Sequence, residues 1–424
     1  MRALLRHAVA HSPFYRESLG ADAPDRPLSE LPTLPKATLM EHFDQVVTDP
    51  RLRRDELEAH LQGPDPGQPF LGEYRVFTTS GSTGLRGVIA FTQHEFDLWT
   101  AANLRMLARI GVTPGTRLVA IGAPSPLHIT KQLFATFQAG RQDAPRLSAL
   151  TPVPELVDAL NAYQPEALVG YPTIAGMLAD EQLAGRLHIQ PRLSGHGAEP
   201  LTPAIRQRIR AAWGFEPANI YATTEAPMIA NSTPAHRGLE IHEDILLVEV
   251  VDEHNQPVPP GTPGFKLLVT NLVNFAQPLV RYEVSDAVAL AEGPNPTGRP
   301  YRRLASVDGR SADVLHFPTR GGGEVAVHPV VLATAFAEQP QIRQYQVLRD
   351  RDGLHVRVVL APDAALDTPA RLRRSLAESV QAAGALPPAV DVRQVAALQR
   401  EPGPAAKLML IKSTHPGGRA APTG

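Results

Sequence analysis

Apolar stretches with helical spacing alternate with short β-branched runs between Glu95 and Pro172, and this alternation restricts the fold more than any other feature. The stretch EFDLWTAANLRMLARIG predicts an amphipathic helix that ends near Gly111. RLVAIGAP predicts a buried strand, and PELVDALNAYQPEALVGYP predicts a helix, a turn and a second strand. Strands that alternate with helices are typical of an α/β fold whose sheet is largely parallel.

The pattern changes after about residue 240. The segments DILLVEVVD, GFKLLVTNL and PLVRYEVSDAVAL predict strands, and turns such as PVPPGTPG join them, which is typical of an antiparallel section. From about Gly309 onward, the strands YQVLRD and HVRVVLAP surround one helix, PARLRRSLAESVQAAG. We therefore expect two domains, residues 1–309 and residues 310–424, with a disordered tail at about residues 415–424.

The composition excludes several classes of protein. A chain of 424 residues can bury one large core or two unequal cores. The net charge of −2 provides no overall field that favours nucleic acid or an anionic membrane. The absence of cysteine excludes disulfides and thiolate zinc sites. The longest apolar runs have the length of strands, and the first residues lack the apolar core of a secretory signal, so we expect a cytoplasmic protein without a membrane segment.

The stretch RVFTTSGSTGLRGVIAFT gathers hydroxyls and glycines between two β-forming segments. Glycines let backbone N–H groups approach a ligand, the hydroxyls add donors, and Arg86 adds a charge. This combination is suited to phosphate oxygens. The Gly-Lys-Ser/Thr ending of a Walker A loop is missing. A polar hairpin turn without a ligand is the alternative interpretation.

The segment TTSGSTGLRG resembles the phosphate loop of the adenylate-forming superfamily, with Arg86 in place of the usual Lys. Arg keeps the charge and can bind phosphate through two hydrogen bonds. IYATTEA, PLVRYEVSD, VDGRSADVL and QREPGPAAKLML resemble further motifs of that superfamily in the same order. HSPFYRESLG, LPTLPKATL, VGYPT and IHEDILLVEVVD narrow the resemblance to the phenylacetate–CoA ligase-like branch. The resemblance implies a large N-terminal α/β adenylation domain with mixed sheets and a small, mobile C-terminal α+β lid.

The resemblance also implies a role for individual residues. At the phosphates of ATP it implies Thr79, Ser80, Gly81, Ser82, Thr83, Gly84 and Arg86; around the adenine and along the nucleotide it implies Gly197, Ala198, Glu199, Tyr221, Ala222 and Thr223; and at the ribose it implies Asp286 and Arg310. Thr224 would contact the α-phosphate, Glu225 would hold Mg²⁺ through carboxylate oxygen, and Lys407 would be the catalytic lysine. Tyr171, His128 and Lys131 would contact the acid substrate.

Several of these residues have a purely structural alternative. Alone, Glu225 could be an ordinary surface acid and Asp286 a turn former, and Tyr221 could be a core aromatic residue. Lys131 and Lys407 could be lysines whose charged ends lie in solvent.

The implied reaction is the activation of an aryl or arylacetic acid with Mg·ATP to an acyl-adenylate and pyrophosphate, followed by acyl transfer to coenzyme A. An amine, a carrier-protein thiol or nitrite as the acceptor stays open, as does a homodimer. Relatives often carry a cysteine-based metal site near ANSTPAHRGLEIHED, and without cysteine we expect no zinc here. Ala312 departs from the hinge motif and, with Arg86 and Ala222, leaves open a degenerate nucleotide-binding module without catalysis.

Overall fold

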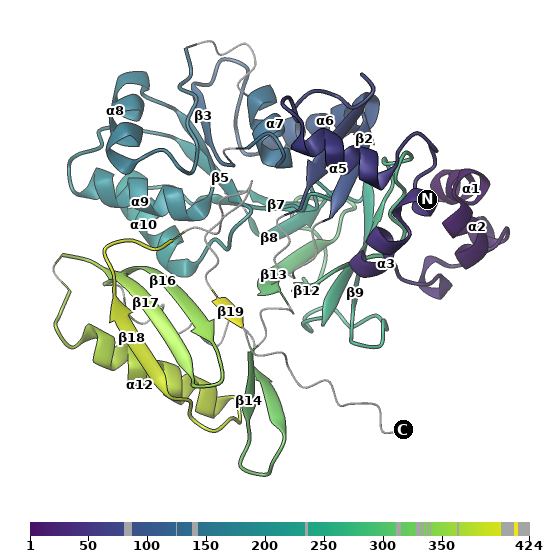
Figure 1. The fold of residues 1–424 in the computed structure, drawn as a ribbon. Helices are drawn as coiled ribbons and strands as arrows, with labels where there is room; N and C mark the ends of the chain where they lie inside the picture. Colours follow the sequence, from purple (N-terminus) through teal and green to yellow (C-terminus); the bar gives the residue numbers. More distant parts are fainter. Residues whose placement is uncertain are drawn as a thin grey trace.

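The computed structural model describes residues 1–79, 87–123, 125–137, 143–233, 236–310, 315–327, 332, 335–336, 339, 341–362, 364–399 and 411–413. Within these residues, the centre is an eight-stranded sheet with the order β12-β13-β8-β7-β6-β5-β4-β3 (Figure 1). Its parallel part comprises β3 (Leu118–Ile121), β4 (Ala167–Gly170), β5 (Leu193–Gly197) and β6 (Ala218–Tyr221). Its antiparallel part comprises β7 (Ala230–Thr233), β8 (His236–Ile241), β13 (Arg303–Arg310) and β12 (Asp286–Leu290). The predicted α/β fold with a parallel and then an antiparallel section is confirmed.

Both faces of the parallel strands are buried, which explains their continuous apolar sequences. Successive side chains of β3 point to opposite faces, so Leu118 and Val119 belong to two different clusters of buried residues. The cluster of Val119 includes residues of two helices, α8 (Val153–Tyr163) and α9 (Pro172–Leu183). The cluster of Leu118 includes residues of α6 (Gln93–Arg109). Two further helices, α7 (Ile129–Phe137) and α10 (Pro203–Trp213), contact β3 and α9 respectively.

The N-terminal segment is a group of short helices, purple and dark blue in Figure 1. They are α1 (Arg2–His11), α2 (Pro13–Leu19), η1 (Ala23–Asp25), η2 (Leu28–Glu30), α3 (Lys36–Glu41), α4 (Phe43–Val46) and α5 (Arg54–Gln62). The hydroxyl of Tyr15 donates to the carbonyl of Pro278 at 2.7 Å and accepts from the amide of Val280 at 3.3 Å. This buried side chain therefore ties the helices to a distant part of the chain.

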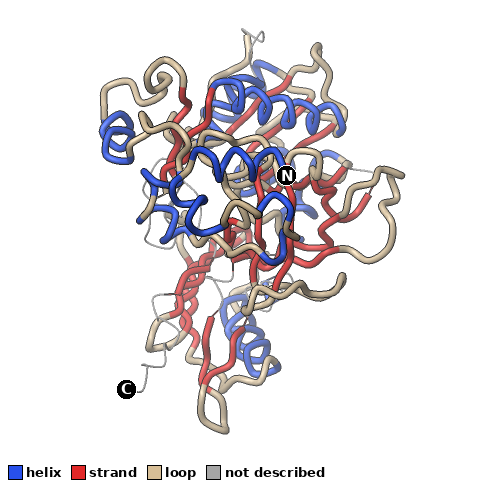
Figure 2. The backbone as a smooth tube through the Cα atoms, turned by 90° about the vertical axis from the view of Figure 1, so that its right-hand side faces the viewer, coloured by secondary structure: helices blue, strands red, loops and turns tan. Residues whose placement is uncertain are grey.

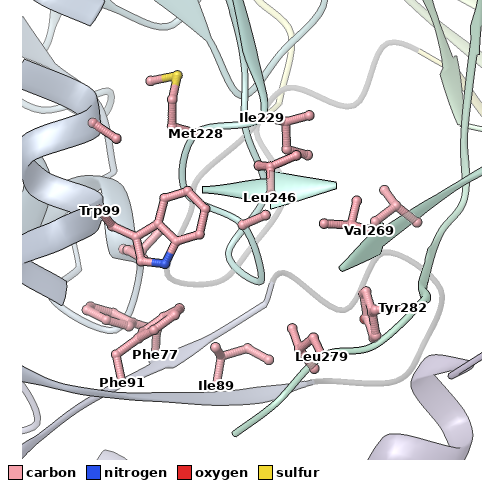
Figure 3. Close-up of a cluster of buried hydrophobic side chains, with 14 of the residues drawn as sticks. Phe77, Ile89, Phe91, Trp99, Met228, Ile229, Leu246, Val269, Leu279 and Tyr282 are labelled. Atoms are coloured by element: carbon pink, nitrogen blue, oxygen red, sulfur yellow. The ribbon is translucent and has the colours of Figure 1, made fainter. Parts of the chain in front are cut away.

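Two smaller sheets lie beside the central one. The strands β1 (Tyr74–Thr78) and β2 (Val88–Thr92) form an antiparallel pair, and β9 (Leu246–Val251), β10 (Lys266–Asn271) and β11 (Tyr282–Val284) form a three-stranded sheet. A shared core joins them: Phe77 and Phe91 from the hairpin lie near Trp99 of α6, and the same cluster extends to Val269 and Tyr282 (Figure 3).

The C-terminal residues form a separate domain with its own core, seen at the bottom of Figure 2. It contains the hairpin of β14 (Leu315–Pro318) and β15 (Glu324–Val327) and a four-stranded sheet in the order β18-β17-β16-β19. The bounds of that sheet are β16 (Ile342–Arg349), β17 (Leu354–Leu360), β18 (Val390–Gln394) and β19 (Ile411–Ser413). The apolar side of α12 (Thr368–Ala382) is buried through Leu372, Leu376 and Val380, spaced by four residues as an amphipathic helix requires.

The predicted boundary between residues 309 and 310 falls at the end of β13. It stays a prediction, as does the mobility of the lid. The tail at residues 415–424 lies outside the described residues. Among the helices that the structure describes, no helix has both the length and the apolar sequence needed to span a membrane.

Candidate active site

Three neighbouring parallel strands end at the same edge of the central sheet, and predicted site residues follow each of them. Tyr171 follows β4, Ala198 follows β5, and the segment 222–224 follows β6. Ligands of open α/β sheets bind outside the carboxyl ends of such strands. These residues line one pocket of about 650 Å³, part of which is open to solvent. Its described lining comprises Asn103, Met106, His128, Ile129, Thr130, Leu133, Phe134, Phe137, Val169, Gly170, Tyr171, Gly197, Ala198, Ile220, Ala222, Thr223, Thr224 and Pro227.

The pocket requires an unusual backbone where β5 ends. A side chain at Gly197 would place its Cβ 2.6 Å from the carbonyl oxygen of Ile220. Ala198 follows with a φ of 67°, a left-handed conformation that costs energy for any residue with a Cβ. At this strained turn the backbone passes close to Ile220 of β6, and Gly197 and Ala198 line the pocket.

Glu199 turns away toward α9, although the sequence predicted it at the adenine. One carboxylate oxygen accepts the hydroxyl of Thr173 at 2.6 Å and its backbone N–H at 3.2 Å. Thr173 lies in the first turn of α9, where backbone N–H groups lack partners within the helix. Glu199 therefore stabilises the start of this helix, and its contact with the nucleotide stays a prediction.

His128 is buried directly before α7 and lines the pocket, and its predicted contact with the acid stays a prediction. Its Nδ1 accepts the backbone N–H of Thr130 at 3.3 Å and lies 2.8 Å from the Thr130 hydroxyl. A ring with Nδ1 as the acceptor carries its proton on Nε2. Lys131 is not among the described lining residues of this pocket, and its proposed role stays a prediction.

The predicted phosphate loop lies between the antiparallel strands β1 and β2. The pairing of these strands agrees with a hairpin, which the phosphate loop and the alternative of a polar turn without a ligand have in common. Residues 80–86, which include Ser80, Gly81, Ser82, Thr83, Gly84 and Arg86, lie outside the described residues. The base of the loop is well defined by Thr79: its hydroxyl oxygen accepts the N–H of Gly87 at 2.8 Å and the Nζ of Lys36 at 2.6 Å. The structure thus places a cation at the base of the loop.

The sequence interpretation did not assign a role to Lys36. It lies in LPTLPKATL, one of the segments that resemble the phenylacetate–CoA ligase-like branch. A Cβ at Gly87 would lie 2.9 Å from the Cε of Lys36, so the glycine makes room for the lysine stem. Nothing in the sequence between these distant segments signals that they meet.

Two motifs of the predicted nucleotide site bind each other reciprocally. The hydroxyl of Tyr221 donates to Asp286 Oδ2 at 2.6 Å, and the hydroxyl of Tyr282 donates to Glu225 Oε1 at 2.8 Å. In each motif the tyrosine precedes the carboxylate by four residues. The segments 221–225 and 282–286 therefore exchange one donor and one acceptor each, which fixes the positions of both carboxylates.

Both carboxylates are largely buried, with 9% of each residue exposed. The side-chain amide of Asn271 donates to the backbone carbonyl of Glu225 at 3.0 Å and fixes that turn. The register of β12 and β13 places Arg310 directly opposite Asp286, so these two predicted ribose residues are cross-strand neighbours. The side chain of Arg310, and Ala312 and Lys407 as a whole, lie outside the described residues.

A polar network around the buried side chains of His242 and Asn231 lies in the segment ANSTPAHRGLEIHED and extends to Arg105 of α6. His242 Nε2 lies 2.8 Å from Asn231 Oδ1, and its Nδ1 lies 2.8 Å from a guanidinium nitrogen of Arg105. Burial, followed by the charge of Arg105, lowers the pKa of His242 to about 3. Asp244 pairs with Arg105 on the other side. The described residues contain no group of three His, Asp or Glu placed to bind a metal, and the expectation of no zinc stays a prediction.

The comparisons with known proteins agree with this geometry. The family model for AMP-binding enzymes matches residues 26–270. The phenylacetate-coenzyme A ligase of Thermus thermophilus is 28% identical over 376 residues, which cover 83% of this chain and 77% of that ligase. The Escherichia coli phenylacetate-coenzyme A ligase is 29% identical over 331 residues, which cover 73% of this chain and 69% of that ligase.

Solved structures support the fold. The 2-hydroxyisobutyryl-CoA ligase in its postadenylation state has a TM-score of 0.74 and 22% identity, covering 93% of this chain and 84% of that chain. The same ligase in its thioesterification state has a TM-score of 0.61 and 22% identity, covering 97% of this chain and 88% of that chain. The overall arrangement of this chain is therefore closer to the first structure.

Proposed function

The chain belongs to the family of AMP-binding enzymes, and we propose that it is an acyl-adenylate-forming acid–thiol ligase similar to phenylacetate-coenzyme A ligases. It activates a carboxylic acid with ATP and transfers the acyl group to coenzyme A. The observation that carries this proposal is the convergence of the motif residues after β4, β5 and β6 on one pocket.

The reaction has two balanced steps. In the first, a carboxylate oxygen of the acid attacks the α-phosphorus of ATP, the bond to the bridging oxygen breaks, and pyrophosphate leaves. In the second, the sulfur of the coenzyme A thiolate attacks the acyl carbon, and AMP leaves with the electrons of the mixed anhydride bond. Both steps depend on positioning and on stabilising charge at the α-phosphate. Thr224 in the pocket and Lys407 in the C-terminal domain are the residues proposed for that charge.

The reciprocal pair of motifs supports the proposed nucleotide site. Asp286 would accept hydrogen bonds from ribose hydroxyls, and Tyr221 fixes its carboxylate from the other side. Arg310, opposite Asp286 in the sheet, would contact the ribose or a phosphate. A buried carboxylate that a protein donor already orients keeps its orientation when a ligand binds, which lowers the entropic cost of binding.

Glu225 fits the proposed role of Mg²⁺ ligand. Mg²⁺ prefers oxygen ligands and is commonly held by one or two carboxylates together with substrate phosphates, so one protein carboxylate is sufficient. Tyr282 binds Oε1 of Glu225, and no donor among the described residues binds Oε2. When bound, the ion would offset the negative charge of the phosphates.

The cation at the base of the loop supports phosphate binding in the same region. Lys36 is held at Thr79 where β1 enters the loop, so its charge adds to that of Arg86 within the loop sequence. We propose that Lys36 orients the loop base and contributes positive potential for the β- and γ-phosphates.

The test is ATP–pyrophosphate exchange with the purified chain across a panel of carboxylic acids, followed by detection of acyl-CoA. Exchange that depends on the acid and thioester formation that depends on coenzyme A are the expected results. Exchange without a thioester, but with product from an amine or a carrier-protein thiol, would reassign the acceptor. ATP binding without exchange for any acid would indicate a binding module without catalysis.

A further inference from the structure

We propose that the pocket selects aryl carboxylic acids that carry a neutral hydrogen-bond donor, a hydroxyl or amino group, and that the side-chain oxygen of Asn103 binds this donor. The inference rests on the proposed function, because it concerns the acid that is activated. It adds a substrate class and a specificity residue.

The orientation of the Asn103 amide is fixed by its neighbours. The Nδ2 group donates to the carbonyl oxygen of Trp99 at 2.8 Å and to that of Pro227 at 3.2 Å. The reverse orientation would set the amide oxygen against two carbonyl oxygens, which cannot donate. Both hydrogens of the amide are therefore used, and Oδ1 must face elsewhere.

The Oδ1 atom of Asn103 has no hydrogen-bond donor among the residues that the structure describes. Only 5% of the residue is exposed. The atom is not fully enclosed by protein, and Asn103 lines the pocket; in the proposal Oδ1 therefore opens into that pocket. An acceptor left without a donor in a desolvated site is costly, and a ligand that supplies the donor removes that cost.

The surroundings of Asn103 indicate what else the ligand must be. The pocket that Asn103 lines is largely apolar, and its apolar residues include Met106, Leu133, Phe134, Phe137, Val169 and Ile220. The rings of Phe134 and Phe137 lie with their centroids 5.6 Å apart. A Cβ at Gly122 would lie 2.5 Å from the Phe134 ring, so this ring packs directly against the backbone at Gly122, the residue that follows β3. Flat, apolar walls of this kind favour an aromatic group.

The charge of the lining excludes an ionic substituent. None of the described residues that line the pocket is Asp, Glu, Lys or Arg. A second carboxylate or an ammonium group on the acid would be desolvated there without a partner of opposite charge. A hydroxyl or an aromatic amine is neutral and donates, and thus satisfies both the oxygen of Asn103 and its apolar surroundings.

The wild-type test uses pairs of benzoic and phenylacetic acids that differ at one ring position, with a hydroxyl or amino group in one acid and a methyl group in the other. For each pair, kcat/KM is measured by ATP–pyrophosphate exchange. For at least one ring position the donor acid should be favoured by about tenfold or more, because a hydrogen-bonding site discriminates strongly against an isostere that lacks the donor.

Replacement of the amide tests the residue itself. In Asn103→Leu the donor-to-methyl ratio should fall by about tenfold. In the matched control Leu107→Met, an apolar change on the same helix at a residue outside the described pocket lining, the ratio should stay within about twofold. Asn103→Leu also removes the hydrogen bond to Pro227 and can lower the amount of folded protein. The ratio is taken within one preparation and is independent of that amount.

The outcomes separate the inference from the function on which it rests. If kcat/KM for the methyl acid equals or exceeds kcat/KM for the donor acid at every ring position, the inference is overturned. The proposed ligase activity is not affected by that result. A donor preference that survives Asn103→Leu assigns the contact to another residue and overturns the role of Asn103. Absence of exchange with every acid overturns the proposed function and the inference together.

Discussion

The two ends of the proposed site are built in different ways, and of the segments 221–225 and 282–286 at the nucleotide end only residues 222–224 line the pocket described above. At the end proposed for the nucleotide, the segments 221–225 and 282–286 bind each other through two tyrosine–carboxylate hydrogen bonds. At the end proposed for the acyl group, α6, α7 and the end of β4 each contribute a few side chains. The first end is encoded in short contiguous segments, and the second arises only when separate elements pack together.

This difference predicts which property of the enzyme a substitution at each end should change. Residues of the nucleotide end serve a part of the reaction that is the same for every acid, so their loss should affect all acids equally. Residues of the acyl end, such as Asn103, should change the preference among acids. A substitution at the nucleotide end that altered the choice of acid would break this division.

The largest expected effect concerns Lys407, which the sequence places in the C-terminal domain. Lys407→Ala should slow adenylation by roughly 10²–10³-fold for every acid, because it removes one positioned charge from the α-phosphate in the transition state. Single-turnover kinetics from ATP measures this step. Thioester formation from a synthetic acyl-adenylate is the control and should persist. Adenylation within about threefold of wild type would leave Lys407 an ordinary surface lysine.

A smaller loss is expected for Glu225→Gln, which removes a charge at nearly constant volume. Tyr282 can still donate to the remaining oxygen, so the fold should stay intact. Adenylation should fall by about 10²-fold at low Mg²⁺ and recover partly as Mg²⁺ is raised. A titration of Mg²⁺ in the exchange assay checks this. An unchanged Mg²⁺ dependence would remove Glu225 from the metal site.

Asp286→Ala should raise the KM for ATP by about tenfold or more, because hydrogen bonds from the ribose to a charged group are lost. The KM for the acid should change little. Steady-state kinetics with each substrate varied in turn separates the two. The reverse result, a raised KM for the acid alone, would contradict the proposed contact between Asp286 and the ribose.

Much of this molecule could be predicted from its sequence. The alternation between Glu95 and Pro172 predicted α6, β3, α8 and β4, because helices and strands buried on one or both faces have distinct periodicities. The motif segments predicted Glu225 and Asp286 as site residues. Their mutual binding through Tyr221 and Tyr282 could not be predicted, since it depends on how two distant segments meet.

Asn103 and Lys36 show what sequence patterns leave out. Asn103 occupies the buried side of α6 together with Trp99 and Met106, and a polar residue in such an apolar stripe is a signal that could have been noticed. The pattern alone could not tell whether its amide faced a pocket or only the core. Lys36 carries no such signal, because its partner Thr79 lies in another element.

The smallest expected effect compares the two tyrosines directly. Tyr282→Phe removes the donor from Glu225, and Tyr221→Phe removes the donor from Asp286, so each variant is the control for the other. Each loses one hydrogen bond to a carboxylate that keeps its charge, and a change of about threefold to tenfold is expected.

If the carboxylates have separate roles, Tyr282→Phe should raise the Mg²⁺ concentration needed for half-maximal exchange and leave the KM for ATP at saturating Mg²⁺ nearly unchanged. Tyr221→Phe should do the opposite, because Asp286 is proposed to bind the ribose and not the metal. Both quantities come from one matrix of exchange rates at varied ATP and Mg²⁺. If both variants shifted the two quantities equally, the paired motifs would act as one structural unit, and the separate assignments of Glu225 and Asp286 would be wrong. A change in the ratio between donor and methyl acids in either variant would instead show that the nucleotide end and the acyl end of the proposed site are coupled.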